Sequence, residues 1–123
     1  MPKREEERTV LLIQSPEGIA VRKRPDKGLL AGLYEFPSLD GFAEETELHA
    51  IFPEAERLRR LSDAKHVFTH RIWRMRGWHI ELRSAAPYEN TFYADADAIR
   101  MRAFPSALRV YREIALDLLE TKN

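Results

Sequence analysis

The sequence predicts an α/β domain with a mixed β-sheet, and three observations lead to that prediction. Short β-branched and aliphatic runs near the start of the chain, and again beyond residue 64, are typical of strands. Apolar residues at helical spacing lie between these regions, and an apolar stripe of helical period ends the chain. With 123 residues, 44% of them hydrophobic and 33% charged, the chain is long enough for one domain with its own core.

The first part of the chain is expected to form a β-hairpin followed by an irregular segment. Two strands, over residues 9–14 and 18–24, flank Ser15-Pro-Glu-Gly18, whose proline and glycine are typical of a turn. The apolar segment that follows, residues 29–37, contains glycines and fits neither a strand nor a helix.

The middle of the chain is expected to form a helix and then the longest strand region. Apolar residues at helical spacing over residues 42–52 predict a helix that Pro53 ends. Residues 55–61 are expected to add a helical turn. Residues 65–83 predict strands, and we expect Gly77 to divide them into two arms.

The two arms are expected to differ in how their faces are covered. In the second arm, apolar and polar residues alternate as in a half-buried strand, with Trp78, Ile80 and Leu82 on one face and His79, Glu81 and Arg83 on the other. In the first arm both faces are expected to be partly covered, one by Val67, Trp73 and Met75 and the other by Phe68 and Ile72.

The end of the chain predicts a short strand and two helices. Residues 91–94 form the expected strand, and residues 95–101 a small helix with Asp95 as its N-cap. Pro105 suits the first turn of the last helix. One apolar stripe then faces the sheet, formed by Leu108, Tyr111, Ile114, Ala115 and Leu118.

Composition excludes several classes of site. The chain has no cysteine, which rules out a disulfide framework, a thiol nucleophile and an iron–sulfur cluster held by this chain, and it fits a cytoplasmic protein. The longest apolar run, residues 10–13, is too short to span a bilayer, so no membrane association is predicted. His66 and His70 are expected to lie roughly 13 Å apart along one strand, too far to share a zinc ion.

The net charge of zero conceals a strong segregation of charge. Residues 35–56 hold seven acidic side chains and no lysine or arginine, whereas residues 57–83 hold eight basic and two acidic ones. A basic segment of this kind suits phosphate neutralisation, because screening confines its field to about 8–10 Å. The alternative is that the two segments pair with each other across the fold. A second basic cluster is Arg22-Lys-Arg24.

Three blocks of sequence resemble the C-terminal domain of MutY-type adenine DNA glycosylases, a relative of the Nudix hydrolases. They are Lys27-Gly-Leu-Leu-Ala-Gly-Leu-Tyr-Glu-Phe-Pro37, Lys65-His-Val-Phe-Thr-His-Arg-Ile-Trp73 and Ala103-Phe-Pro105. The resemblance extends from about Thr9 to about Ala115 and implies a Nudix-like mixed sheet sandwiched between helices. Residues 9–123 are then expected to be the domain, and residues 1–8 a charged tail or the remnant of an interdomain linker.

The residues with which Nudix hydrolases bind magnesium are not matched in this sequence. The family signature has an Arg-Glu pair followed by a Glu-Glu pair, but no arginine precedes Glu44, Glu45 and Glu47 and no second acidic pair follows at the right helical offset. Magnesium needs only one or two protein carboxylates, and Glu54 and Glu56 are also near in sequence, so a degenerate pyrophosphohydrolase remains the alternative. The preferred interpretation is an exposed helix face with no metal and no catalytic residue.

The segment Phe68-Thr69-His70 matches the place where MutY-type domains typically have Phe-Ser-His, and the resemblance implies that it recognises 8-oxoguanine. In 8-oxoguanine N7 carries a hydrogen, whereas N7 of guanine is an acceptor. A hydroxyl both donates and accepts, so Thr69 suits N7, and its backbone N–H suits the new C8 carbonyl. Phe68 is expected to anchor the segment or wedge beside the base, and His70 to bind a phosphate or orient Thr69.

Four basic residues are the expected contacts to the DNA backbone: Lys65, Arg71, Arg74 and Arg76. Such contacts position a duplex and carry little sequence information. Each is alternatively a solvated charge at the edge of the sheet.

The resemblance implies a non-catalytic module that recognises 8-oxoguanine opposite adenine in double-stranded DNA during base excision repair. Its expected partner is the N-terminal catalytic domain of the same protein, a glycosylase domain with an iron–sulfur cluster, and its expected location is the bacterial nucleoid. The domain itself is expected to need no cofactor. A protein-interaction module that uses the acidic segment or the apolar Leu29-Leu30-Ala31 stretch is the other alternative.

Overall fold

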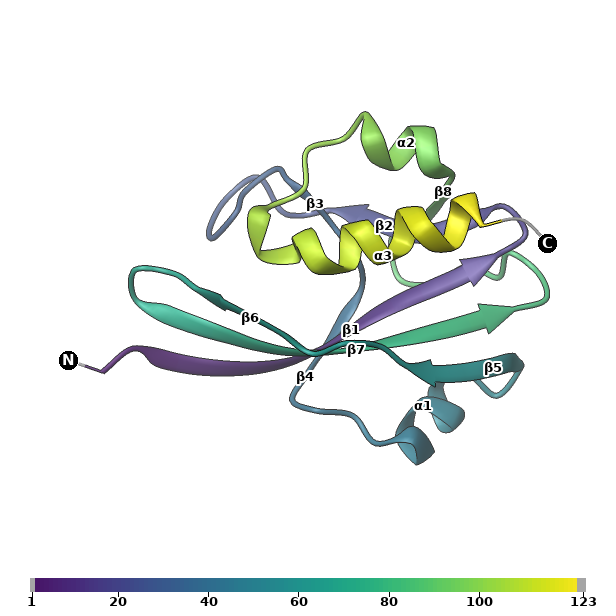
Figure 1. The fold of residues 1–123 in the computed structure, drawn as a ribbon, viewed down its shortest axis with the longest axis horizontal. Helices are drawn as coiled ribbons and strands as arrows, with labels where there is room; N and C mark the ends of the chain where they lie inside the picture. Colours follow the sequence, from purple (N-terminus) through teal and green to yellow (C-terminus); the bar gives the residue numbers. More distant parts are fainter. Residues whose placement is uncertain (1, 122–123) are drawn as a thin grey trace.

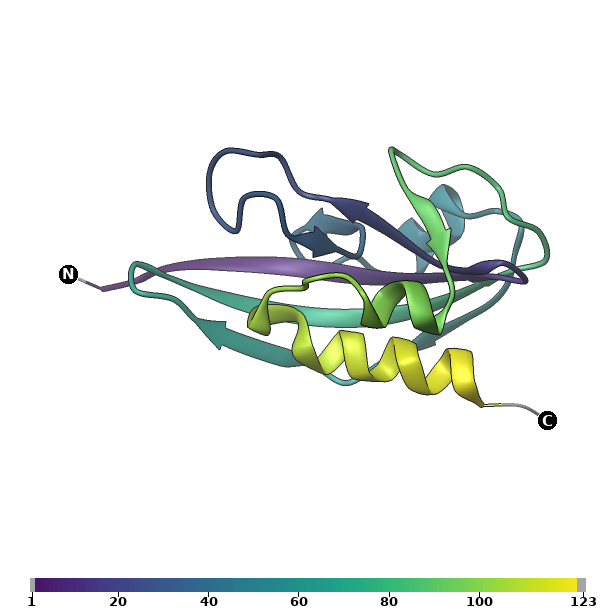
Figure 2. The same ribbon diagram turned by 90° about the horizontal axis from the view of Figure 1, so that it is seen from above.

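A mixed β-sheet lies between helices on both of its faces in the computed structural model, which describes residues 2–121 (Figure 1, Figure 2). The strand order is β3-β2-β1-β7-β5, while β4, β6 and β8 pair with β1, β7 and β2. The strands are β1 (Arg4–Ser15), β2 (Gly18–Lys23), β3 (Tyr34–Glu35), β4 (Ser38–Asp40), β5 (Ala55–Arg60), β6 (Ala64–Val67), β7 (Arg71–Leu82) and β8 (Phe92–Ala94). The helices are α1 (Glu45–Ile51), α2 (Ala96–Arg100) and α3 (Arg109–Glu120), the last preceded by a 3-10 turn over Ser106–Leu108. The predicted α/β architecture is confirmed.

Two hydrophobic cores lie on opposite faces of the sheet. Leu12 belongs to the core under α2 and α3, whereas its neighbours Leu11 and Ile13 belong to the core over α1. Because successive residues of a strand point to opposite faces, a central strand covered on both sides must be apolar at consecutive positions. This explains the continuous apolar run in β1. No helix within residues 2–121 has the length and hydropathy needed to cross a membrane.

The strand β1 begins earlier than expected. It pairs in parallel with β7 over nearly its whole length, from Arg4 opposite Arg71 to Gln14 opposite Glu81. Residues 4–8, expected to be a tail or linker remnant, are therefore part of the sheet. The unbroken run of charged residues in this segment hid the strand, because it carries no apolar side chain until Val10.

Residues 55–61 were expected to form a helical turn, and that prediction is wrong. They form β5, which pairs antiparallel with β7 and places Leu58 opposite Ile80. Its sequence, Ala-Glu-Arg-Leu-Arg-Arg, is unfavourable for a strand by propensity alone. Pairing with the neighbouring strand and contact of Leu58 with the core over α1 outweigh that preference.

Gly77 does not divide β7, which runs unbroken from Arg71 to Leu82. A β-carbon at this position would lie 2.4 Å from Cε1 of Tyr111. The ring of Tyr111 is fully buried, and its hydroxyl donates to the carbonyl of Ser62 at 2.9 Å. Glycine at this position therefore makes room for the tyrosine of α3 and does not end the strand.

The other predicted elements are confirmed with small changes of boundary. The hairpin of β1 and β2, the helix α1 before Pro53 and the strand β8 all form. Asp95 caps α2 by accepting from the amide of Ala98 at 2.8 Å. The apolar stripe of the last helix faces the sheet, with Tyr111 and Ala115 fully buried.

His79 was expected on an exposed face of β7, but it is only 2% exposed. Its Nε2 lies 2.8 Å from Oε1 of Gln14, and its Nδ1 lies 3.4 Å from Nη2 of Arg59. A guanidinium only donates, so Nδ1 accepts from Arg59 and Nε2–H donates to Gln14. The imidazole is thereby held in its neutral form.

Burial, with the nearby charges of Arg59 and Arg57, lowers the pKa of His79 from its ordinary 6.5. The unfolded state takes up the proton more readily, so stability is complete above the unfolded pKa and is lost as the pH falls below it. We expect the free energy of unfolding to fall more steeply from about pH 7 to pH 5 in the parent protein than in His79→Gln. Urea titrations across this range measure both slopes. The exposed His49→Gln is the matched control, and equal slopes for all three proteins would contradict the expectation.

Candidate nucleic-acid interface

The segment Phe68-Thr69-His70 forms the tip of the hairpin between β6 and β7, at the same end of the molecule as the start of β1 (Figure 1). The amide of Phe68 donates to the carbonyl of Arg71 at 2.8 Å, which closes the turn and leaves Thr69 and His70 as its two central residues. Both are exposed. The sequence interpretation placed all three in a strand, and the turn moves them to a projecting position.

Phe68 connects the tip to the core. Its ring meets Trp73 edge to face at a centroid distance of 4.9 Å, and it meets His66 in the same way at 4.7 Å. Trp73 itself is only 2% exposed. The sequence predicted that Phe68 lies on the face opposite Trp73 and that Val67 shares the face of Trp73. In the structure Phe68 packs against Trp73. Val67 is exposed and lies opposite Ile72. The prediction was wrong because the turn pairs Val67 with Ile72 and His66 with Trp73, so these pairs share a face, which a single continuous strand would not allow.

Lys3 and Arg4, at the start of the described chain, hold the tip in place through hydrogen bonds. Lys3 Nζ donates to the carbonyl of Phe68 at 2.9 Å, and the amide of Arg4 donates to the carbonyl of His70 at 3.2 Å. Two of the three carbonyls at the tip are therefore occupied. Within residues 2–121 the amide and hydroxyl of Thr69 and the imidazole of His70 make no hydrogen bond, so these groups are free to meet a ligand.

The four expected backbone contacts lie on two different faces of the hairpin. Lys65 is directly opposite Arg74, and Arg76 follows two residues later, so these three side chains share the face toward α1. Arg71 lies on the other face, the one that Trp73 also occupies. The structure thus brings together three of the four residues and separates Arg71 from them.

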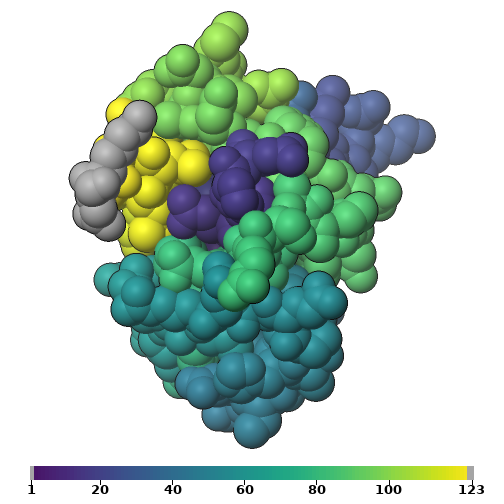
Figure 3. Space-filling view, turned by 90° about the vertical axis from the view of Figure 1, so that its right-hand side faces the viewer, coloured from purple at the N-terminus to yellow at the C-terminus, as the bar shows by residue number. Residues whose placement is uncertain are grey.

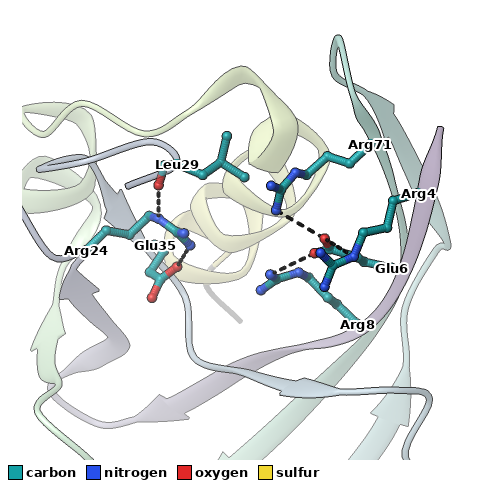
Figure 4. Close-up of polar contacts among 7 residues, drawn as sticks. All are labelled: Arg4, Glu6, Arg8, Arg24, Leu29, Glu35 and Arg71. Atoms are coloured by element: carbon teal, nitrogen blue, oxygen red, sulfur yellow. Dashed lines mark hydrogen bonds and ion pairs between the residues drawn. The ribbon is translucent and has the colours of Figure 1, made fainter. Parts of the chain in front are cut away.

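Arg71 belongs to a cluster in which one carboxylate meets three guanidinium groups (Figure 4). Glu6 lies 3.1 Å from Nη1 of Arg71, 3.4 Å from Nη2 of Arg8 and 3.6 Å from Nε of Arg4. The glutamate side chain is only 18% exposed, and the guanidinium of Arg8 also lies 4.2 Å above the ring of Trp73. This arrangement holds Arg71 in place beside the tip.

Lys65, Arg74 and Arg76 line a surface pocket of about 390 Å³ together with Phe42. Arg74 forms an ion pair with Glu5, and that hydrogen bond, followed by the charges of Arg74 and Lys65, lowers the pKa of Glu5. The guanidinium of Arg76 lies 4.1 Å above the ring of Phe42. Asp63 also lines the pocket, so basic side chains outnumber acidic ones there, and Phe42 forms one aromatic wall.

A partly buried ion triad was missed by sequence reasoning. Glu35 accepts from Nε of Arg22 at 2.9 Å. It also accepts from Nη1 of Arg24 at 2.6 Å, and Arg24 donates to the carbonyl of Leu29 at 3.1 Å (Figure 4). Two members of the second basic cluster are thus structural. The available signal was a single carboxylate within the apolar run Leu-Tyr-Glu-Phe-Pro.

The acidic residues considered for magnesium are dispersed. Glu47 accepts from the amide of Glu44 at 3.0 Å in the capping box of α1, and Glu56 forms an ion pair with Arg83. Within residues 2–121, no three or more His, Asp or Glu side chains are grouped so that they could hold a metal ion. Among the same residues, Glu56–Arg83 is the only ion pair that joins the acidic segment to the basic one, so most of the basic segment is not neutralised by it.

Comparison with known proteins finds relatives of both the sequence and the fold. Mouse adenine DNA glycosylase is 34% identical over 84 residues, which cover 56% of this chain and 16% of the mouse protein. The C-terminal domain of mouse MUTYH, solved in complex with human PCNA, superposes with a TM-score of 0.65 at 21% identity and covers 97% of this chain and 100% of that one. MutT of methicillin-resistant Staphylococcus aureus 252, a Nudix hydrolase, gives a TM-score of 0.64 at 17% identity over 95% of this chain and 99% of that one.

The chain thus matches only a small part of the adenine glycosylase, while its fold is shared with that enzyme's C-terminal domain and with MutT. The family model of the NUDIX domain matches residues 9–113, nearly the whole chain. The chain belongs to the NUDIX domain family.

Proposed function

We propose that this chain is a DNA-binding module that recognises 8-oxoguanine opposite adenine on behalf of an adenine DNA glycosylase. The observation that carries the proposal is the hairpin tip, where Thr69 and His70 project with unengaged polar groups from a braced turn. The similarity to mouse adenine DNA glycosylase supports it. Excision of adenine would then be performed by a separate domain with its own iron–sulfur cluster, and this chain would contribute recognition.

The chemistry of the tip suits the lesion. In 8-oxoguanine the hydrogen on N7 needs an acceptor and the C8 carbonyl needs a donor. Thr69 supplies both within one residue, through its hydroxyl and its amide. Guanine offers an acceptor at N7 and no carbonyl at C8, so one polar group would stay unpaired, at a cost of about 1–3 kcal/mol.

Rigidity at the tip adds to this selectivity. Phe68 is fixed against Trp73, and the carbonyls on both sides of Thr69 are tied to Lys3 and Arg4. A preorganised contact loses less conformational entropy on binding than a mobile loop does. Hydrolysis of nucleotides receives less support, because Glu47 and Glu56 are engaged in the fold.

The proposal is tested by NMR titration of the domain, at low salt, with duplexes that contain 8-oxoguanine:adenine or guanine:adenine. We expect larger shifts at Phe68, Thr69 and His70 with the lesion. Shifts that are the same with both duplexes and spread over the arginines would show that the chain binds DNA without recognising the lesion. Magnesium-dependent shifts at Glu44 and Glu47, without any response to DNA, would favour a nucleotide hydrolase.

Thr69→Ala removes the acceptor for the N7 hydrogen of 8-oxoguanine but keeps the amide that suits its C8 carbonyl. We therefore expect it to reduce the preference for 8-oxoguanine:adenine over guanine:adenine by at most about tenfold, which corresponds to about 1.4 kcal/mol. Fluorescence anisotropy with both duplexes measures the ratio of the two dissociation constants. Thr69→Ser retains the hydroxyl and is the matched control, expected to keep the preference. Equal losses on the two duplexes in Thr69→Ala would assign the residue to general binding.

A further inference from the structure

We infer that Lys65, Arg74 and Arg76, with Phe42, form a phosphate-binding pocket for one strand of the duplex, and that Glu5 holds Arg74 of this pocket when DNA is absent. The inference deepens the proposed function and rests on it for the identity of the ligand. It adds a defined site on one face of the hairpin and an internal competitor for that site.

Two cations in the pocket have no carboxylate partner within residues 2–121. Lys65 forms no ion pair there, and Arg76 has only the ring of Phe42 beneath its guanidinium. Asp63 also borders the pocket, but it is paired with Arg60 at 2.8 Å. Positive charge therefore exceeds negative charge around a depression of about 390 Å³, which suits a phosphate group.

Glu5 shows that one cation of the pocket, Arg74, already binds an anion. Its carboxylate accepts from Nε of Arg74, and the charges of Arg74 and Lys65 both favour its ionised form, which lowers its pKa. The two side chains of the pair are 53% and 46% exposed, so solvent and ligands reach them. Such an exposed pair is weak, and a phosphate makes charge-assisted hydrogen bonds to the same guanidinium.

The distance from the tip to the pocket fits the dimensions of a duplex. Lys65 is four residues from Thr69, roughly 13 Å along an extended chain. The major groove is about 12 Å wide and about 8.5 Å deep. If Thr69 meets a base edge on the floor of the groove, the pocket reaches the phosphates at its rim.

The opposite face of the hairpin is less suited to this role. Arg71 is tied to Glu6, whose side chain is shielded together with that of Arg8. A phosphate would have to displace a carboxylate that three arginines hold. We therefore assign the backbone contact to the face with Lys65, Arg74 and Arg76 alone.

Glu5→Gln tests the competition directly, because it removes the charge and keeps the shape of the side chain. We expect the affinity for both the lesion duplex and an undamaged duplex to rise about two- to fivefold, the range typical of an exposed ion pair. Glu17→Gln is the matched control. It makes the same change in net charge, at the turn between β1 and β2 at the far end of the molecule, where Figure 3 shows this turn (purple) between the last helix (yellow) and the segment before β8 (green).

The gain from Glu5→Gln must disappear in an Arg74→Gln background, since Glu5 acts by holding Arg74. Arg74→Gln alone should weaken all duplexes alike and reduce the salt slope by about one. A gain that Glu17→Gln reproduces, or that persists without Arg74, would overturn the inference. So would a failure of both duplexes to bind at low salt.

The experiment separates the inference from the proposed function. Equal affinity for damaged and undamaged duplexes, with the gain from Glu5→Gln intact, would refute lesion recognition and retain the phosphate pocket. NMR signals of the Arg74 and Arg76 guanidinium groups identify the source of the phosphate. If dGTP shifts them and a duplex does not, the pocket belongs to a nucleotide and the assignment to the DNA backbone is overturned.

Discussion

Glu35→Ala is expected to lower the free energy of unfolding by about 3 kcal/mol. The glutamate side chain is only 11% exposed, and its two oxygens accept separately from Arg22 and Arg24. Alanine would leave two partly buried guanidinium groups without an anion. Such a loss is costly because the remaining charges stay desolvated without compensation. Urea denaturation followed by tryptophan fluorescence measures the change.

Two control variants define the origin of this effect. Glu35→Gln keeps the shape and removes the charge, so a similar loss would assign the effect to electrostatics. Glu45→Ala removes an exposed carboxylate that faces His49 at 3.4 Å, and we expect it to change the free energy by less than about 0.5 kcal/mol. If Glu35→Ala costs no more than Glu45→Ala, the triad contributes nothing to stability.

Gly77→Ala is expected to destabilise the fold by about 2 kcal/mol, within the range for overpacked cores. The new methyl group would meet the buried ring of Tyr111 at 2.4 Å and also the side chain of Leu61 at 3.2 Å. The ring has little room to retreat, because its hydroxyl is tied to Ser62. The same denaturation experiment measures the loss.

A double-mutant cycle with Tyr111→Leu identifies the clash as the cause. Tyr111→Leu removes the ring and has its own cost, but Gly77→Ala should cost much less in that background. An unchanged cost would show that the conformation of the strand, and not the ring, requires glycine at this position.

Much of the fold was predictable because local pattern and tertiary environment agree. The apolar stripe of the last helix and the hairpin around Ser15 and Gly18 are examples in which periodicity and turn chemistry indicate the same element. Residues 55–61 show the opposite case. Their charged sequence has no strand signal, and only pairing with β7 makes them a strand. Likewise, position 77 requires glycine because of the ring of Tyr111, which lies 34 residues further along the chain.

The candidate site was predictable in part. Residue type and resemblance selected Thr69 and its neighbours, but the position of the turn determines how they are presented. In one continuous strand through residues 65–76, Lys65 would share a face with Arg71 and not with Arg74. The turn after Phe68 instead places Lys65 opposite Arg74 and leaves Arg71 on the other face. The role of Glu5 depends on a strand that local sequence does not reveal, because charged residues fill that part of β1.

The parallel pairing of β1 with β7 also has a kinetic consequence. Lys3 and Phe68, which meet at the tip, are 65 residues apart in the sequence. Contacts of such long range form slowly, because the entropy of closing the intervening loop must be overcome first. The hairpin of β6 and β7 is local and can form early, but its tip acquires its brace only when the first strand docks. The last region to reach its native arrangement during folding is thus expected to be the tip, where we propose that the damaged base binds.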